Sequence, residues 1–299
     1  MLRADVLRAK CVRATCSRAY VLFGFLIVFM VLHGVAHAQQ RPLVTEDPET
    51  IGSGLVLVEG GVEQQRKVFY PLSGLTGDLF KAPTLGLSLG VGPIAEIQID
   101  WTPYQRLSVS ERETAPLSAM LDFTGDETTD VDDVVIGTKV RLVGEGTGHP
   151  AIGVRFATRL PNAGNESGLG TDTMDFYVSG LVGKTIESIR VVGNVGLGLL
   201  SDPLRGDQQN DVLTYGASVA RAVKQGLEVV GEINGRMSLH ESDEVPVGTE
   251  DRSIVRFGGR YTFKTVRVDG GLLFGLTSRD PNFGFTAGAT WVFRAFNIP

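Results

Sequence analysis

The chain has 299 residues, a net charge of −6 at pH 7 and a hydrophobic content of 42%. After the first 38 residues it contains no cysteine, its net charge is −10, and no apolar run approaches the ~18 residues of a membrane-spanning helix. These features exclude disulfide scaffolds, thiolate metal sites, general nucleic-acid binders and helical membrane proteins. The apolar content also excludes an intrinsically disordered chain.

The first 38 residues have the layout of a secretory signal peptide. Five basic residues between Arg3 and Arg18 precede an apolar core at residues 21–32, and the small-x-small pattern Ala36-His37-Ala38 follows it. We therefore expect cleavage before Gln39 and export of the mature chain. The alternative is an uncleaved anchor, which the short apolar core disfavours.

The mature chain shows strict alternation of apolar and polar residues and no helical periodicity. In residues 151–160, for example, Ile152, Val154 and Phe156 share one face, and Arg155 lies on the other. Most of the runs are close to the ~9–11 residues with which a tilted strand crosses a bilayer. They predict twelve strands, at residues 54–68, 82–92, 95–106, 133–144, 149–160, 173–185, 189–200, 211–223, 227–240, 253–263, 266–277 and 282–295.

The connections between these strands alternate in length. Tight turns follow the even-numbered strands, and usually longer loops follow the odd-numbered strands, at residues 69–81, 107–132, 161–172, 201–210, 241–252 and 278–281. Short periplasmic turns and longer outer loops are typical of transmembrane β-barrels. The prediction is an all-β fold: a transmembrane antiparallel β-barrel of about twelve strands over residues 53–299. A signal peptide (1–38) and a periplasmic N-terminal segment (39–52) precede it, and a soluble lipocalin-like or sandwich fold is the alternative.

Charged residues collect on the strand face opposite to the apolar one. An Arg or Lys that faces lipid costs ~2–4 kcal/mol near the bilayer midplane, so this face is expected to line the lumen. Two interpretations remain open: a salt-bridge network that fills the barrel, or a polar pore. The predicted pore-lining residues are Glu59, Glu96, Asp100, Lys139, Arg141, Arg155, Arg159, Arg190, Glu228, Glu232, Arg236, Arg256, Arg260, Arg267 and Asp269.

Signals for catalysis or ligand chemistry are weak. His240 precedes Ser242, and an outer-membrane lipid hydrolase could use such a pair on the barrel wall. The stretch Gly183-Lys184-Thr185 lacks the first glycine of a phosphate-binding loop. Acidic loops at 107–132 and 241–252 could touch divalent ions that bridge lipopolysaccharide, but they lack EF-hand spacing. We predict no catalytic residue, no metal site and no cofactor.

Several stretches resemble the family named for the MetA pathway of phenol degradation. They are RPLVTEDP at residues 41–48, DVVIGTKVRL at 133–142, HPAIGVRFATRLP at 149–161 and GLGTDTMDF at 168–176. The resemblance implies an exported outer-membrane barrel and uptake of hydrophobic or aromatic compounds. It implies no catalytic residues.

Together these features predict a channel in the bacterial outer membrane for passive uptake of small hydrophobic or aromatic molecules. The expected partners are outer-membrane lipid and lipopolysaccharide, the barrel-assembly machinery and a small-molecule solute, with no nucleic acid. A non-conducting structural barrel and an outer-membrane lipid hydrolase remain the alternatives.

Overall fold

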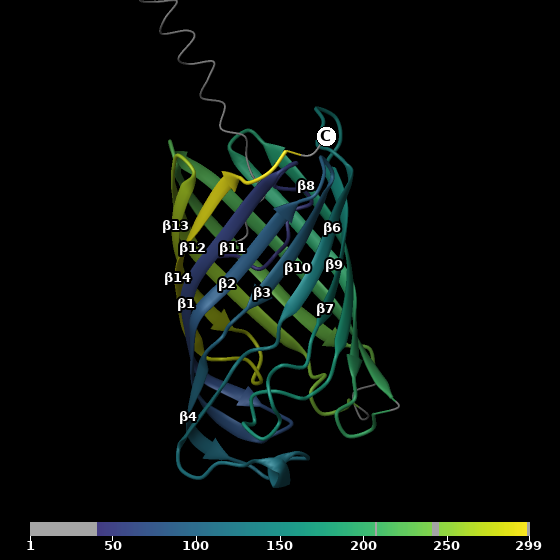
Figure 1. Cartoon of the computed structure of the whole chain (residues 1–299), viewed down its shortest axis with the longest axis vertical. Helices are drawn as coiled ribbons and strands as arrows, with labels where there is room; N and C mark the ends of the chain where they lie inside the picture. The colour runs from purple at the N-terminus through teal and green to yellow at the C-terminus, as the bar shows by residue number, and fades with distance from the viewer. Residues whose placement is uncertain (1–40, 207, 241–244, 298–299) are drawn as a thin grey trace, which may run out of the picture. The chain divides into compact units, whose positions relative to one another are not determined.

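The computed structural model describes residues 41–206, 208–240 and 245–297, and the predicted signal peptide lies outside them. One antiparallel sheet contains fourteen strands, and β1 pairs with both β14 and β2, which closes a barrel of twelve strands (Figure 1). The prediction of a twelve-stranded antiparallel barrel is confirmed. Its strands are β1 (Leu55–Tyr70), β2 (Leu75–Gly90), β3 (Ala95–Trp101), β6 (Val135–Val143), β7 (Ala151–Arg159), β8 (Asp175–Ile186), β9 (Ile189–Ser201), β10 (Gln209–Lys224), β11 (Leu227–Ser238), β12 (Arg252–Phe263), β13 (Val266–Gly275) and β14 (Phe283–Arg294).

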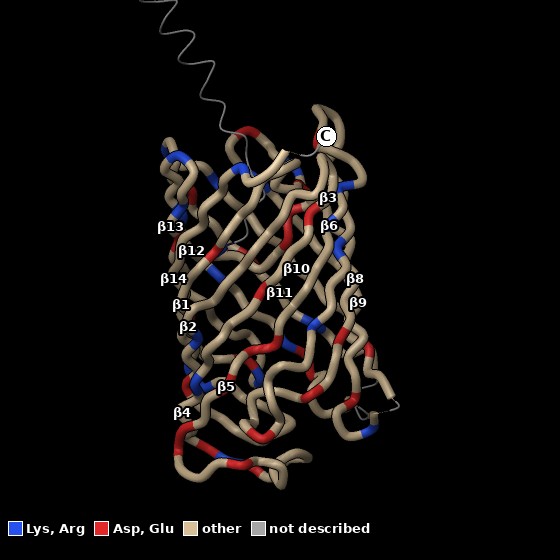
Figure 2. The backbone as a smooth tube through the Cα atoms, in the orientation of Figure 1, with Lys and Arg blue, Asp and Glu red and all other residues tan. Residues whose placement is uncertain are grey.

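The two faces of the wall differ as the alternation predicts. On β9, Val191, Val195 and Leu197 are exposed on the outer surface, whereas Val192, on the other face, is buried. Charged residues recur along the strands themselves and not only in the loops (Figure 2). Closure pairs the backbone groups of the first and last strands, as a wall in hydrocarbon requires.

Two connections differ from the prediction. The predicted loop 69–81 is reduced to residues 71–74, because β1 and β2 continue past the barrel as a long hairpin. The predicted loop 107–132 contains most of β4 (Gln105–Arg112), the 3-10 helix η1 (Ser118–Met120) and β5 (Glu127–Asp130). Strand β4 pairs with the outer half of β2, and β5 pairs with β4.

This extension has an apolar cluster of its own, which explains why it folds outside the barrel. Val68, Leu75, Leu79, Leu107 and Val109 are buried together there, with Leu169 from the loop between β7 and β8. Burying such side chains stabilises the hairpin by ~1.5–3 kcal/mol for each fully buried residue. Within the described residues, no helix has the length and apolar character needed to cross a membrane.

The first prediction concerns the outer surface. Val195, in the middle of β9, is 57% exposed, and Val223, near the turn end of β10, is 60% exposed. We expect Val195→Arg to lower the free energy of unfolding in lipid by ~2–4 kcal/mol and Val223→Arg by ~0–1 kcal/mol, because the cost of a cation depends on depth. Equilibrium unfolding in phospholipid vesicles measures both variants, and equal effects would contradict a lipid-facing surface.

Candidate functional site

Residues 41–52, which we call the lumen segment, run through the interior of the barrel. At one end, Arg41 Nε lies 3.5 Å from Asp269 Oδ1 on β13, and at the other the Ile51 N–H donates to Glu96 Oε2 on β3 at 2.7 Å. The sequence predicts a periplasmic N-terminal segment at 39–52. Its described residues, 41–52, lie against the inner wall, where their acidic side chains meet inward-facing cations.

The wall supplies the hydrogen-bond partners of this extended segment. The backbone N–H groups of Val44 and Thr45 donate to the Glu232 carboxylate of β11 at 2.8–3.0 Å. Asn194 of β9 pairs with Glu46 in both directions: its Oδ1 accepts from the Glu46 N–H, and its Nδ2 donates to the Glu46 carbonyl, both at 2.7 Å. Side chains thus replace the strand partner that an isolated backbone segment would otherwise need.

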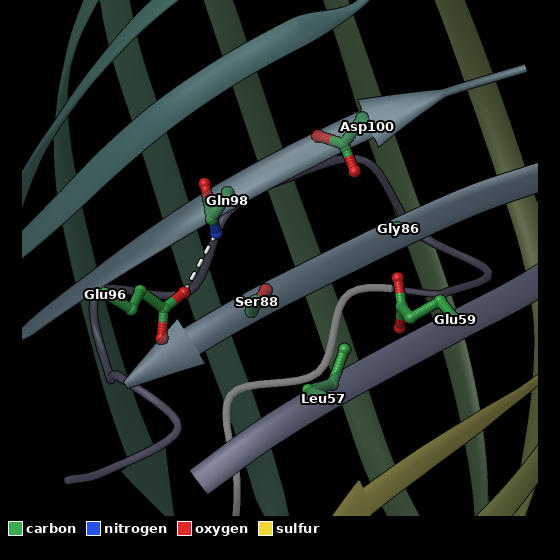
Figure 3. Close-up of a pocket in the computed structure, with 7 residues that line it drawn as sticks. All are labelled: Leu57, Glu59, Gly86, Ser88, Glu96, Gln98 and Asp100. Atoms are coloured by element: carbon green, nitrogen blue, oxygen red, sulfur yellow. Dashed lines mark hydrogen bonds between the residues drawn. The ribbon is translucent and has the colours of Figure 1, made fainter. Parts of the chain in front are cut away.

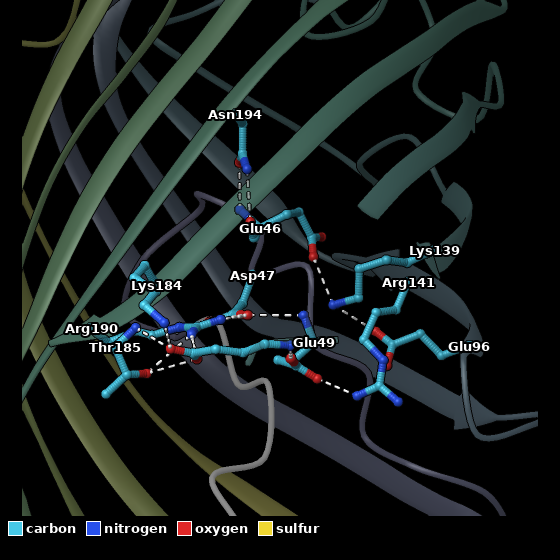
Figure 4. Close-up of polar contacts among 11 residues, drawn as sticks. Glu46, Asp47, Glu49, Glu96, Lys139, Arg141, Lys184, Thr185, Arg190 and Asn194 are labelled. Atoms are coloured by element: carbon cyan, nitrogen blue, oxygen red, sulfur yellow. Dashed lines mark hydrogen bonds and ion pairs between the residues drawn. The ribbon is translucent and has the colours of Figure 1, made fainter. Parts of the chain in front are cut away.

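Glu46 lies at the centre of a buried ionic cluster. Its carboxylate is 3.3 Å from Lys139 Nζ, and Lys139 is also 3.0 Å from Glu96 (Figure 4). Arg155 Nε lies 3.1 Å from the same Glu46 carboxylate. The Lys139 side chain is 1% exposed. Removing one partner from such a cluster costs ~3–5 kcal/mol, because a buried charge is then left uncompensated.

A second ionic cluster lies next to the first, near the turns. Asp47 binds Arg190 of β9 at 2.6 Å, and Glu49 forms an ion pair with Arg141 of β6 (Figure 4). Arg190 is also 2.6 Å from Glu145, in the turn between β6 and β7. The three acidic residues of the segment, Glu46, Asp47 and Glu49, are therefore neutralised by cations of the wall.

The turn residue Glu145 is held by several donors. Its carboxylate accepts from the Thr185 N–H at 2.7 Å and from Thr185 Oγ1 at 3.1 Å, and Lys184 is 3.5 Å away. Desolvation alone would raise the pKa of Glu145, but the hydrogen bonds from Thr185 and the charges of Arg190 and Lys184 outweigh it, so the pKa is lowered. Glu145 is therefore ionised at neutral pH and fixes Arg190 in place.

Glycines on the inner wall make room for the lumen segment. A Cβ atom on Gly216 would lie 2.9 Å from Thr45 Oγ1, and a Cβ on Gly183 would lie 3.0 Å from Pro48 Cγ. A Cβ on Gly90 would lie 1.8 Å from the Gly52 carbonyl oxygen, so no larger residue fits at that position. The high glycine content is therefore explained in part by a backbone that crosses the lumen.

The remaining predicted residues also lie on the inner face, where most pair with one another. Arg155 is 3.8 Å from Asp100, and Arg256 is 3.2 Å from Glu232. Further ion pairs on the wall are Arg260 with Glu228, Arg267 with Glu59, and Arg159 with Asp133 and Asp175. Arg236 is different, because it donates to the backbone carbonyls of Gly248 and Glu250. Whether these side chains line a conducting pore stays a prediction.

A small polar cavity lies against the inner face of the adjacent wall strands β1, β2 and β3. Glu59, Glu96 and Asp100 line it together with Gln98, which donates to Glu96 at 2.9 Å (Figure 3). Its volume is about 10 Å³, which is room for about one water molecule. This part of the lumen is too narrow to hold an organic solute.

A larger cavity lies at the loop end of the barrel, and we call it the outer cavity. It is formed by the outer ends of β1 and of β7 to β12 and by the loops that connect them, and its volume is about 210 Å³. Its lining combines apolar side chains such as Leu72, Leu200 and Val247 with Tyr70 and Tyr177. Apolar cavities of about 150 Å³ accept a benzene molecule, so a solute with one ring fits here.

Sequence reasoning missed several residues of the outer cavity. Tyr70 and Arg252 each fall just beyond the predicted ends of their strands, and Leu72 falls within a predicted loop. Asp175, which lies within a predicted strand and lines the cavity, is 1% exposed and forms an ion pair with Arg159. The alternation of inward and outward residues could have placed Asp175 on the inner face, since it lies two residues from Tyr177 on the same strand.

The structure gives no further support to a lipid hydrolase or to a metal site. His240 is exposed, and its backbone N–H donates to Ser238 Oγ at 3.3 Å. Ser242, the proposed partner of His240, lies outside the described residues. Within the part of the chain that the structure describes, no group of three or more His, Cys, Asp or Glu residues could hold a metal ion.

Comparison with known proteins decides the family. The model of the family described as "Putative MetA-pathway of phenol degradation" matches residues 40–293. The chain belongs to this family. No curated protein matches it.

Among solved structures, this family member is similar to the COG4313 outer membrane channel from Pseudomonas putida F1, with a TM-score of 0.57, 15% identity and coverage of 83% of this chain and 98% of that chain. This likeness shows that the fold is that of an outer-membrane barrel. The translocator domain of autotransporter NalP from Neisseria meningitidis has a TM-score of 0.45 at 12% identity, and covers 95% of this chain and 99% of its own. The Pseudomonas putida toluene transporter TodX has a TM-score of 0.39 at 11% identity, and the match covers 84% of this chain and 92% of that chain.

The second prediction tests where the lumen segment lies. A Cβ on Gly216 would be 3.6 Å from the Thr45 Cβ, which is within the ~3.5–4.5 Å range of disulfides, and the chain has no cysteine after residue 38. We expect the double variant Thr45→Cys/Gly216→Cys to form a disulfide in the folded protein, visible as altered mobility on a non-reducing gel. The control Thr45→Cys/Gly60→Cys should not, because a Cβ on Gly60 has no other residue within 4 Å. A folded Thr45→Cys/Gly216→Cys protein that stays reduced under an oxidant would contradict the location.

Proposed function

We propose that this protein is an outer-membrane channel for passive uptake of small hydrophobic or aromatic molecules, and that it is not an enzyme. The observation that carries the proposal is the outer cavity, which lies at the loop end and has room for a one-ring solute. Membership of a family described by phenol degradation supports this class of solute.

The state of the inner wall argues against a general pore for hydrophilic solutes. Cations such as Arg141, Arg155 and Arg190 are bound to carboxylates of the lumen segment, so their charges are already compensated. A pore that attracts ions needs wall charges that face water. A solute in the outer cavity meets the lumen segment next, and we expect displacement of this segment to limit the rate of passage.

The apolar outer surface of the barrel indicates which molecules surround it. Exposed aromatic residues such as Phe257 and Trp291 face outward, where we expect outer-membrane lipid and, at the loop end, lipopolysaccharide. Export through a cleaved signal peptide and insertion by the barrel-assembly machinery complete the proposal.

The third prediction tests uptake through the outer cavity. Thr173 lines this cavity, whereas Thr147 is exposed in a turn at the opposite end of the barrel. We expect porin-deficient bacteria that express the protein to take up radiolabelled benzyl alcohol several-fold faster than cells without it. Thr173→Trp should remove most of this gain because the indole fills the cavity, and the control Thr147→Trp should retain it. Equal uptake with and without the protein would contradict the proposal.

A further inference from the structure

We propose that the outer cavity selects small organic anions, and that Arg236 and Arg252 hold the carboxylate of such a solute. This inference rests on the proposed function, since it names the charge of the solute that enters the same cavity. The observation behind it is a pair of arginines that face one another without a counter-ion.

Arg236 of β11 and Arg252 of β12 are direct partners in the antiparallel register. Like charges that face each other across two strands destabilise the pairing. Two such cations on the wall of one cavity create a local excess of positive charge, which an anion would relieve.

The protein does not neutralise this pair. Arg236 donates to the carbonyls of Gly248 at 2.5 Å and Glu250 at 3.2 Å, and Arg252 donates to the Phe69 carbonyl at 3.0 Å. Within residues 41–206, 208–240 and 245–297, neither guanidinium has a carboxylate within 4.0 Å, and Arg252 Nε is buried without a hydrogen-bond partner. Carbonyl oxygens stabilise the orientation of an arginine but carry no compensating net charge.

Asp175 and Glu250, the carboxylates near the two arginines, form no ion pair with them. Asp175 forms an ion pair with Arg159 and accepts from Tyr177 Oη at 3.3 Å and from the Ser201 N–H at 3.0 Å. Both oxygens of Glu250 accept from the Gly248 N–H at 3.1 Å. Arg159 is compensated by Asp133 and Asp175, so Arg236 and Arg252 are the two cations of the described lining that form no ion pair.

The other lining residues indicate what is attached to the carboxylate of the solute. Tyr70, Leu72 and Leu200 provide apolar surface in the same cavity as the two guanidinium groups. An arginine fork binds a carboxylate in a planar, bidentate geometry, which a neutral hydroxyl group cannot reproduce. The arrangement therefore fits a carboxylate with an apolar body of about one ring.

The experiment measures binding of benzoate to the purified full-length mature barrel by isothermal titration calorimetry at pH 7 and low salt. We expect Arg236→Gln/Arg252→Gln to weaken benzoate binding about tenfold or more, because hydrogen bonds to charged groups are lost. The control Arg205→Gln removes one positive charge from an exposed loop at the same end of the barrel and should leave binding unchanged. The variant Arg236→Lys/Arg252→Lys keeps the charge without the fork, and should bind with intermediate affinity.

Two results would overturn the inference: no benzoate binding to the unaltered protein, or equal binding to the unaltered protein and the Gln double variant. Heat-modifiable gel mobility verifies that each variant is folded before titration. The inference and the proposed function fail separately. Faster benzyl alcohol uptake by expressing cells, without selective benzoate binding, would retain the channel and refute the anion site. Benzoate binding would refute the channel if expressing cells take up neither benzyl alcohol nor benzoate faster than cells without the protein.

Discussion

The structure depends on pairing the charges of the inner wall inside a narrow, closed cylinder. Lipid excludes these charges from the outer face, and a twelve-stranded barrel offers little water to solvate them inside. The lumen segment solves much of this problem: Glu46, Asp47 and Glu49 bring three carboxylates to four cations of the wall. Glu96 supplies a further partner to Lys139. A segment held by several buried ion pairs is not easily removed, since each uncompensated charge costs ~3–5 kcal/mol.

This pairing makes the two ends of the lumen different. The part near the turns is filled by the lumen segment and closely packed against glycines such as Gly90 and Gly183. The loop end is hollow, and its lining keeps two arginines, Arg236 and Arg252, that the protein itself does not neutralise. A solute therefore meets a selective cavity first and an ionic barrier second. Arg236 and Arg252 of the outer cavity select the solute, whereas the ion pairs of the lumen segment resist its passage.

Alternation of residues was sufficient to predict the wall, because lipid and lumen impose opposite demands on successive side chains. The fifteen predicted inward charges follow from the same parity. The lumen segment could not be predicted in this way, since it has no regular strand neighbour and its hydrogen bonds and ion pairs come from strands all around the barrel, among them β2, β3, β6, β7, β9, β11, β13 and β14. In hindsight two signals indicated it: the acidic run of residues 46–49, and glycines at inner positions of the wall. The outer cavity was missed because Tyr70 and Arg252 lie at strand ends, where boundaries are set by the long hairpin and by loop packing.

Ion selectivity in planar bilayers tests the central claim most directly. The measurement compares the unaltered protein with the triple variant Glu46→Gln/Asp47→Asn/Glu49→Gln. The account predicts larger conductance steps and a shift toward anion selectivity in the variant, because Arg141, Arg155 and Arg190 lose their partners in the lumen segment while the wall keeps its positive charge. Unchanged conductance and unchanged selectivity in a folded variant would contradict the account.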